Sequence, residues 1–264
     1  MNEPEREAGE PGERQRPRRL GRSIFILPSL FTVGNIFCGY YAILATMAGN
    51  YDLAARAIGI AIIMDMLDGR IARLTNSATG FGLQLDSLAD VISFGIAPSI
   101  LVLVWGLAPL NHRLGWIAAF TFAICGAMRL ARFNIQAGNL RHFVGLPIPA
   151  GGGVIAAVVH FFGGKVENQV GAGLLVAMVF ALSFLMVSTI RYSSLKSLTL
   201  GKKSHLTILF ISLLVALIYN YSRPTLLAIA VAYTLSGVVA RLYGLLRHRR
   251  PAEELALAGP LEHH

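Results

Sequence analysis

Long apolar runs separated by short polar segments dominate the chain. Eight stretches are apolar over about the 20 residues that a helix needs to cross the hydrocarbon core of a bilayer. They cover residues 23–48, 53–74, 82–107, 114–136, 143–163, 170–190, 204–221 and 224–245. Because the connections between them are short, we expect successive helices to run antiparallel. The pattern predicts an all-α integral membrane protein, a bundle of about eight transmembrane helices.

Composition and the ends of the chain complete this division. The 264 residues are 55% hydrophobic and 14% charged, whereas soluble domains carry about 25% charged residues. Residues 1–22 are rich in Glu, Arg, Pro and Gly, which predicts a disordered basic N-tail without a cleavable signal peptide. The transmembrane domain is expected over 23–245, and a C-terminal tail over 246–264. The last four residues, 261–264, resemble an expression-tag remnant.

The net charge of +9 follows from basic residues placed at the ends of the apolar runs. Nucleic-acid binding would need a basic face on a soluble fold, so no nucleic-acid partner is expected. With the N-terminus in the cytoplasm, 19 of the 23 Lys and Arg residues fall on the cytoplasmic side. Cytoplasmic loops carry the excess of positive charge in membrane proteins. The count therefore predicts that both termini are cytoplasmic.

Four aspartates interrupt the second and third apolar stretches. A carboxylate in a membrane span is costly and indicates function. Asp65 and Asp68 are three residues apart, and Asp86 and Asp90 are four apart, so each pair shares a helix face. The short turn at 75–80 makes the two helices neighbours. All four carboxylates are therefore expected to converge near the cytoplasmic end of one helix pair.

Carboxylates this close repel one another unless a positive charge joins them. Hard divalent cations such as Mg²⁺, Mn²⁺ or Ca²⁺ prefer oxygen ligands and would neutralise the cluster. Two such metals, about 3.5–4 Å apart, can clamp a diphosphate. Small residues beside the aspartates would admit it: Gly69 and Ala72 leave room for a phosphate, and Arg73 offers it a positive fork. Gly82 lets the third stretch approach closely, although a single glycine in a membrane helix more often serves packing.

Two other interpretations of the carboxylates stay open. Pairing with Arg70 and Arg73 would merely make burial tolerable, although two arginines cannot readily neutralise four carboxylates. Alternatively, the site belongs to a transporter for a divalent cation or a small anion. A transporter would not need an alanine and an arginine at the offsets of Ala72 and Arg73.

Together these residues form the pattern Asp65-x2-Asp68-Gly69-x2-Ala72-Arg73-x8-Gly82-x3-Asp86-x3-Asp90. It resembles the signature of the CDP-alcohol phosphotransferases at every position. The resemblance implies that Asp65, Asp68 and Asp86 bind metal, and that Asp90 both shares in metal binding and acts as the general base. Gly69, Ala72, Arg73 and Gly82 would border the CDP-lipid. It also implies a catalytic six-helix core, here extended by two C-terminal helices, and a homodimer.

Further segments resemble the phosphatidylserine synthase branch of that family. They are residues 27–35, 87–98, 129–134, 143–150 and 186–196. Residues 143–150 have a simpler interpretation as the proline-kinked start of a span. The resemblance implies transfer of a phosphatidyl group from CDP-diacylglycerol to L-serine, giving phosphatidylserine and CMP. Thr32 and Asn35 would support the cytidine end of the donor. The enzyme is expected in a prokaryotic cell membrane, its active site facing the cytoplasm.

The acceptor site is predicted at the cytoplasmic end of the fourth stretch. Arg129 and Arg132 lie three residues apart with Asn134 just beyond, and an arginine fork can hold the carboxylate of serine. Both arginines could instead only anchor the helix end among lipid headgroups. Glycerol phosphate, inositol phosphate or choline would be alternative acceptors within the family.

Overall fold

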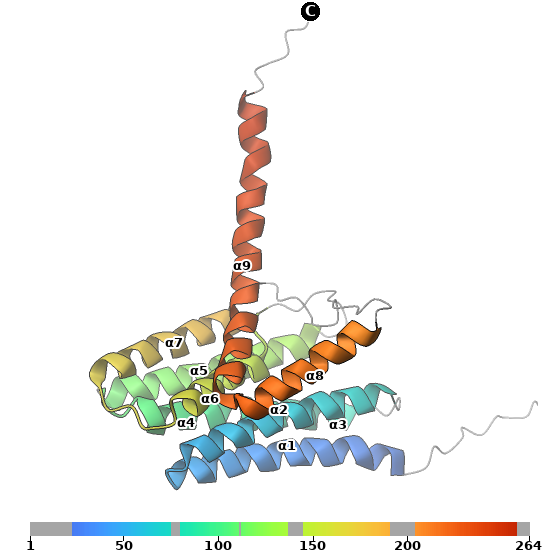
Figure 1. Cartoon of the computed structure of the whole chain (residues 1–264), viewed down its shortest axis with the longest axis vertical. Helices are drawn as coiled ribbons and strands as arrows, with labels where there is room; N and C mark the ends of the chain where they lie inside the picture. Colours follow the sequence, from blue (N-terminus) through green and yellow to red (C-terminus); the bar gives the residue numbers. More distant parts are fainter. Residues whose placement is uncertain (1–22, 75–79, 111, 137–144, 191–203, 258–264) are drawn as a thin grey trace, which may run out of the picture.

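The computed structural model describes residues 23–74, 80–110, 112–136, 145–190 and 204–257, and these ranges contain helices and no strand (Figure 1). The helices are α1 Ser23–Met47, α2 Tyr51–Leu74, α3 Gly80–Asp90, η1 Val91–Ile96, α4 Ala97–Gly106, α5 His112–Gln136, α6 Ile148–Phe162, α7 Gln169–Val187, α8 Ser204–Asn220 and α9 Ser222–Leu257. Within the described residues, five helical segments are long and apolar enough to cross a membrane. The prediction of an all-α membrane bundle is confirmed. The predicted tail at 1–22 and the tag remnant at 261–264 lie outside the described residues.

The helices begin and end close to the predicted stretches, with three differences. The third stretch is divided into α3, the π-helix η1 and α4, which follow one another without a break. Helix α6 begins at Ile148 instead of residue 143. Helix α9 continues to Leu257, so part of the tail predicted from residue 246 is helical. Residues 252–257 are mostly Ala, Glu and Leu, good helix formers that apolarity alone does not detect.

The π-helix has a local cause in Pro98, near the start of α4. Proline has no backbone N–H, so the Phe94 carbonyl four residues earlier cannot receive its α-helical hydrogen bond. The Ala97 amide donates instead to the carbonyl of Ile92, five residues back. Such wide turns often occur at functional sites, and this one begins directly after Asp90.

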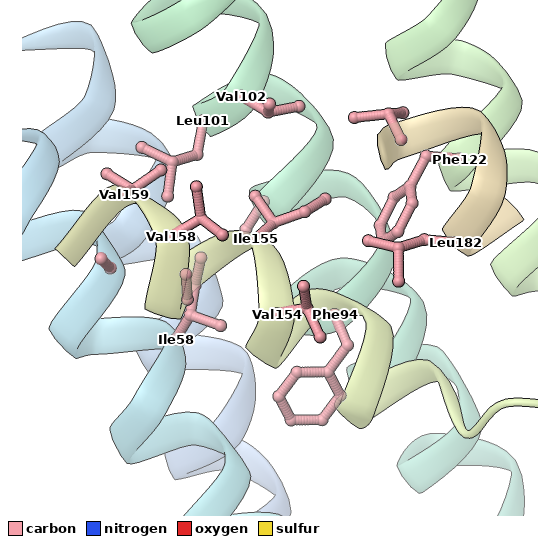
Figure 2. Packing of buried hydrophobic residues seen from close by; sticks show 14 of the residues in the cluster. Ile58, Phe94, Leu101, Val102, Phe122, Val154, Ile155, Val158, Val159 and Leu182 are labelled. Carbon is pink, nitrogen blue, oxygen red and sulfur yellow. The ribbon is translucent and has the colours of Figure 1, made fainter. Parts of the chain in front are cut away.

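Helix α6 lies at the centre of the packed core (Figure 2). Its side chains Val154, Ile155, Val158 and Val159 are buried. They face residues of five other elements: Ile58 of α2, Phe94 of η1, Leu101 and Val102 of α4, Phe122 of α5 and Leu182 of α7. Lipid is as apolar as leucine, so close packing rather than escape from water must hold these helices together.

Two glycines allow helices α1 and α6 to pack closely against η1. A Cβ on Gly39 of α1 would lie 2.3 Å from Ser93 Oγ and 2.7 Å from Ser93 Cα. A Cβ on Gly152 of α6 would lie 2.9 Å from the Phe94 carbonyl oxygen. The segment that follows Asp90 is therefore clamped between α1 and α6, and this fixes the direction of the carboxylate.

Candidate active site

The carboxylates of Asp65, Asp68 and Asp86 meet between α2 and α3. Asp65 and Asp68 share one face of α2 because they are one turn apart. One oxygen from each of the three residues lies within 4.8 Å of the others. Asp68 is buried, whereas Asp65 and Asp86 are half-buried. The first predicted pair of carboxylates is thus brought together with Asp86 of the second pair.

Asp90 adjoins this group of three without belonging to it. It is the last residue of α3 and is 8% exposed. Its side chain lies within hydrogen-bonding reach of Asp65, and the charges of Asp86 and Asp68 also act on it. Its Oδ1 atom is buried without a hydrogen-bond partner among the described residues. Asp90 is therefore next to the candidate metal ligands and has one oxygen available for another group.

A divalent metal ion fits this set of donors. Among the described side chains, both ion pairs involve Asp52, and none joins Lys or Arg to the four site carboxylates. Arg70 is exposed, and the side chain of Arg73 lies outside the description. Asp86 Oδ1, like Asp90 Oδ1, is buried without a partner. Hard divalent cations take carboxylate oxygens such as these as ligands. The cluster can therefore bind a metal ion through Asp65, Asp68 and Asp86.

Helix α1 supports the carboxylates from the opposite side. Thr32 Oγ1 donates a hydrogen bond of 3.0 Å to Asp68 Oδ2. Asn35, one turn further on, is fully buried, and both polar atoms of its side-chain amide lack a partner among the described residues. Its backbone carbonyl accepts a 2.9 Å hydrogen bond from Ser93 Oγ of η1. Thr32 thus orients Asp68, a candidate metal ligand. The side-chain amide of Asn35 remains available to form hydrogen bonds with a bound substrate.

The three predicted acceptor residues occupy different environments. Arg129 of α5 is half-buried, its Nε atom is buried without a partner among the described residues, and it interacts electrostatically with Asp90. Arg132 is exposed. Asn134 donates a 2.9 Å hydrogen bond to Ser87 Oγ and so ties α5 to α3. Only Arg129 of the two arginines is brought to the carboxylates.

The remaining predicted residues lie on the same two helices. Gly69 follows Asp68 on α2 and is half-buried, and Gly82 is half-buried at the start of α3. Ala72 and Arg73 belong to the last turn of α2, but their side chains lie outside the description. The segments 137–144 and 191–203, which include parts of two resemblance motifs, also lie outside it.

Some site residues could not be recognised from the sequence. Ser93 is fully buried and joins η1 to α1, yet a serine in an apolar run gives no signal of its own. Ser87 links Asn134 to the Leu83 carbonyl. Pro98 was the one available signal, because it marks where the regular helix after Asp90 must change.

Comparison with known proteins agrees with this geometry. The family model for the CDP-alcohol phosphatidyltransferase matches residues 25–182. The chain is 35% identical over 235 residues to a CDP-diacylglycerol–serine O-phosphatidyltransferase of Helicobacter pylori, covering 85% of this chain and 94% of that protein. It is 35% identical over 170 residues to the Bacillus subtilis protein of the same name, covering 64% and 91%.

An archaeal protein extends the comparison. An archaetidylserine synthase of Methanothermobacter thermautotrophicus is 35% identical over 172 residues, covering 64% of this chain and 70% of that protein. The family match spans more than half of the chain and includes all four site aspartates. The chain therefore belongs to the CDP-alcohol phosphatidyltransferase family.

Proposed function

We propose that this enzyme transfers a phosphatidyl group from CDP-diacylglycerol to L-serine and releases phosphatidylserine and CMP. The observation that carries the proposal is the convergence of Asp65, Asp68 and Asp86, with Asp90 beside them, in a chain of this family. Relatives named for serine transfer support the choice of acceptor. Serine and CDP-diacylglycerol are accordingly the proposed substrates.

In this mechanism Asp90 acts as the general base. The serine hydroxyl is a very weak acid, so a base must take its proton as attack proceeds. The serine oxygen forms a bond to the phosphorus that carries the diacylglycerol, and the bond from that phosphorus to the bridging diphosphate oxygen breaks. CMP leaves with that oxygen, while the proton passes to the carboxylate of Asp90. The unpartnered Oδ1 of Asp90 supports this role.

Asp65, Asp68 and Asp86 would hold the divalent metal, with Asp90 contributing in part. We propose Mg²⁺ or Mn²⁺, with Ca²⁺ as a further candidate, because all three prefer carboxylate oxygens. When bound, the metal would neutralise the diphosphate and stabilise charge on the departing oxygen. The hydrogen bond from Thr32 fixes one Asp68 oxygen, so that its other oxygen can point to the metal.

The CDP-lipid would lie along α2 and α3, with its acyl chains toward the bilayer. Large apolar side chains flank the carboxylates and are exposed, among them Met66 at 57%, Phe81 at 74% and Leu88 at 61%. Such a surface beside charged residues suits a substrate with an apolar tail and a diphosphate head. Gly69, Gly82, Ala72 and Arg73 would border the diphosphate. The unpartnered amide of Asn35 supports a contact with the nucleotide.

Serine would approach Asp90 from the side of Arg129. The guanidinium can bind the serine carboxylate through two parallel hydrogen bonds. Its buried, unpartnered Nε supports such a role, whereas the exposed Arg132 is better suited to a headgroup contact. Asn134 would stabilise this side of the site through Ser87.

The distribution of basic residues supports a site that opens to the cytoplasm, where CDP and serine are found. We propose eight membrane crossings with both termini cytoplasmic, and a homodimer as in the family resemblance. Cysteine substitution at residues of the described connections, followed by labelling from either side of the membrane, tests this topology. Labelling of residues 163–168 only from the cytoplasm would refute the proposed orientation.

The decisive test of function is an acceptor screen. Purified enzyme is given CDP-diacylglycerol, Mg²⁺ or Mn²⁺, and radiolabelled serine, glycerol phosphate, inositol phosphate or choline in separate reactions. Labelled phosphatidylserine with equimolar CMP is expected, and Asp90→Asn serves as the inactive control. A labelled lipid from another acceptor alone would change the acceptor and keep the chemistry. Absence of CMP release with every acceptor, together with metal uptake into proteoliposomes, would favour a transporter.

A further inference from the structure

The hydroxyl of Ser93 in η1 forms a hydrogen bond with a different helix. Ser87, Ser183 and Thr46 each donate to the carbonyl oxygen four residues earlier in their own helix, which is the usual choice for a hydroxyl in a helix. Ser93 Oγ donates instead to the backbone carbonyl of Asn35 on α1, at 2.9 Å, and the serine is fully buried. That carbonyl also accepts the α-helical hydrogen bond of α1. The bond from Ser93 therefore joins two helices and is not needed to complete either of them.

The backbones of α1 and η1 lie close together at this bond. Gly39 is one turn beyond Asn35, and a Cβ on it would lie 2.3 Å from Ser93 Oγ, 2.7 Å from Ser93 Cα and 2.9 Å from Ser93 Cβ. A larger residue at this position would have to displace η1, because the Cα atom cannot rotate away. From the other side, a Cβ on Gly152 of α6 would lie 2.9 Å from the Phe94 carbonyl oxygen. Hence η1 has little room to move in either direction.

The geometry of η1 determines where the carboxylate before it points. A π-helical turn holds about one residue more than an α-helical turn, and one residue corresponds to about 100° of rotation in an α-helix. Beyond η1, Leu101, Val102 and Trp105 of α4 are buried in the core. If η1 became a regular α-helix, Asp86 and Asp90 would turn by about 100° relative to that buried face. The direction of both carboxylates thus depends on the π-helical form of η1.

One face of α1 contacts both halves of the site. Thr32, Asn35 and Gly39 are spaced three and four residues apart, so they share this face. Thr32 donates a hydrogen bond of 3.0 Å to Asp68 Oδ2, and Gly39 lies against Ser93. Asn35, between them, accepts the hydrogen bond from Ser93. Helix α1 therefore sets the position of a candidate metal ligand relative to the segment that follows the proposed base.

We propose that Ser93 is a positioning residue for the proton transfer. Through the Asn35 carbonyl and the close contact with Gly39, it holds η1 in the form that directs the Asp90 carboxylate toward the acceptor hydroxyl. Because Ser93 is fully buried, it acts through Asp90 and not on a substrate. The inference rests on the proposed function, since it requires Asp90 to be the base. Its effect should appear in kcat, and the KM values for both substrates should change little.

The first test is Ser93→Ala, which removes only the hydroxyl. The full-length enzyme in detergent with Mg²⁺ is assayed for CMP release, with serine varied at saturating CDP-diacylglycerol and then the reverse. We expect kcat to fall about five- to tenfold, because a small displacement of a reacting group slows the chemical step, with both KM values within twofold of wild type. Ser183→Ala is the matched control, since Ser183 is buried and bonds only to the Val179 carbonyl of its own helix. Its kcat should be unchanged, and an unchanged kcat in Ser93→Ala would overturn the inference.

The second test changes the other side of the contact. Gly39→Ala should lower kcat more than Ser93→Ala does, because the new methyl group displaces η1. Gly59→Ala on α2 is its control, since a Cβ there would meet no atom within 4 Å. Adding Ser93→Ala to Gly39→Ala removes the atom closest to the new methyl group. The double variant should therefore be no slower than Gly39→Ala alone, whereas fully multiplied losses would show that the two residues act independently and would contradict the proposal.

A double-mutant cycle with Asp90→Asn decides whether Ser93 acts through the base. In the Asp90→Asn background, Ser93→Ala should change the residual turnover by less than twofold, since the group that it positions is gone. A full further loss would overturn the inference. If Asp90→Asn turned over at the wild-type rate, the proposed base would fail and the inference with it. A slow Asp90→Asn together with a normal Ser93→Ala would reject the inference alone. If serine is not the acceptor, the same cycle is measured with the alcohol that supports CMP release.

Discussion

Helix α2 carries residues of two polar clusters. In one cluster the polar groups have hydrogen-bond or ion-pair partners within the protein, and in the other some of them do not. Near the start of α2, Asp52 pairs with Arg56 at 2.7 Å and with His160 at 2.5 Å, and His160 reaches Ser222 at 3.0 Å. About 20 Å further along the helix, at 1.5 Å rise per residue, the carboxylates of Asp65 and Asp68 begin the second cluster. There four like charges meet without an ion pair among the described residues.

The difference separates a structural cluster from a ligand site. Every described polar group of the Asp52 cluster has a partner within the protein, so the cluster is complete as folded. In the aspartate cluster, Asp86 Oδ1 and Asp90 Oδ1 are buried and unpartnered. A buried charge without a partner destabilises a fold. Its presence therefore indicates that a bound ligand, such as a cation, interacts with these carboxylates in the functional protein. Removing one group from each cluster should therefore have opposite consequences: loss of activity in one, and loss of stability in the other.

The largest expected effect is that of Asp90→Asn. The amide has nearly the same shape as the carboxylate but cannot take the proton from the serine hydroxyl. Turnover should fall by about 10²- to 10⁴-fold, the usual contribution of a general base, while CDP-lipid binding stays within a few-fold. Turnover is measured as CMP release, and binding by titration with a fluorescent CDP-lipid. Turnover near the wild-type level would remove Asp90 from the chemistry.

Removal of metal should be nearly as severe. EDTA should suppress turnover to background, because one nearby arginine, Arg129, cannot neutralise four carboxylates, and added Mg²⁺ or Mn²⁺ should restore it. Asp65→Ala and Asp68→Ala should weaken both metal and nucleotide binding, as measured by calorimetry. Asp52→Asn, in the other cluster, is the control, and it should leave the metal affinity unchanged. Full activity after exhaustive chelation would exclude a metal mechanism.

A smaller effect is expected at the acceptor arginine. Lysine keeps the charge of Arg129 but loses the planar fork. Arg129→Lys should therefore raise the serine KM more than tenfold, a loss above about 1.4 kcal/mol, with the CDP-lipid KM near normal. Arg132→Lys is the matched control on the same helix, and its serine KM should be unchanged because Arg132 is exposed. An unchanged serine KM in both variants would mean that both arginines only anchor the helix end and set the membrane topology.

The sequence was sufficient for the bundle and for the aspartates. Most of the apolar runs are about one bilayer thick, so the helices follow from length, and carboxylates are conspicuous where charge is costly. Spacing alone could not decide between Arg129 and Arg132. Residues three apart lie on overlapping faces of a helix, and the packing of α5 against its neighbours determines which of them points inward.

The contacts that orient the site depend on long-range packing. The hydrogen bonds from Thr32 to Asp68 and from Asn134 to Ser87 join helices far apart in sequence. Neither Thr32 nor Ser87 interrupts its apolar run strongly enough to predict a partner. The π-helix after Asp90 was likewise not predicted, because its local cause, Pro98, lies several residues beyond Asp90 within an apolar run.

The smallest expected effect tests the structural cluster through Ser222→Ala. The variant removes the hydrogen bond to His160 and leaves the pairs of Asp52 intact, so the loss should be about 1 kcal/mol, typical of one hydrogen bond. Thermal unfolding in detergent should show a Tm lower by about 2–4 °C. Ser236→Ala is the matched control on α9, because its hydroxyl is exposed and bonds only to the Tyr233 carbonyl within the same helix; its Tm should change less. A tenfold fall in kcat at an unchanged Tm would mean that the Asp52 cluster takes part in the reaction, and the distinction between matched and unmatched clusters would fail.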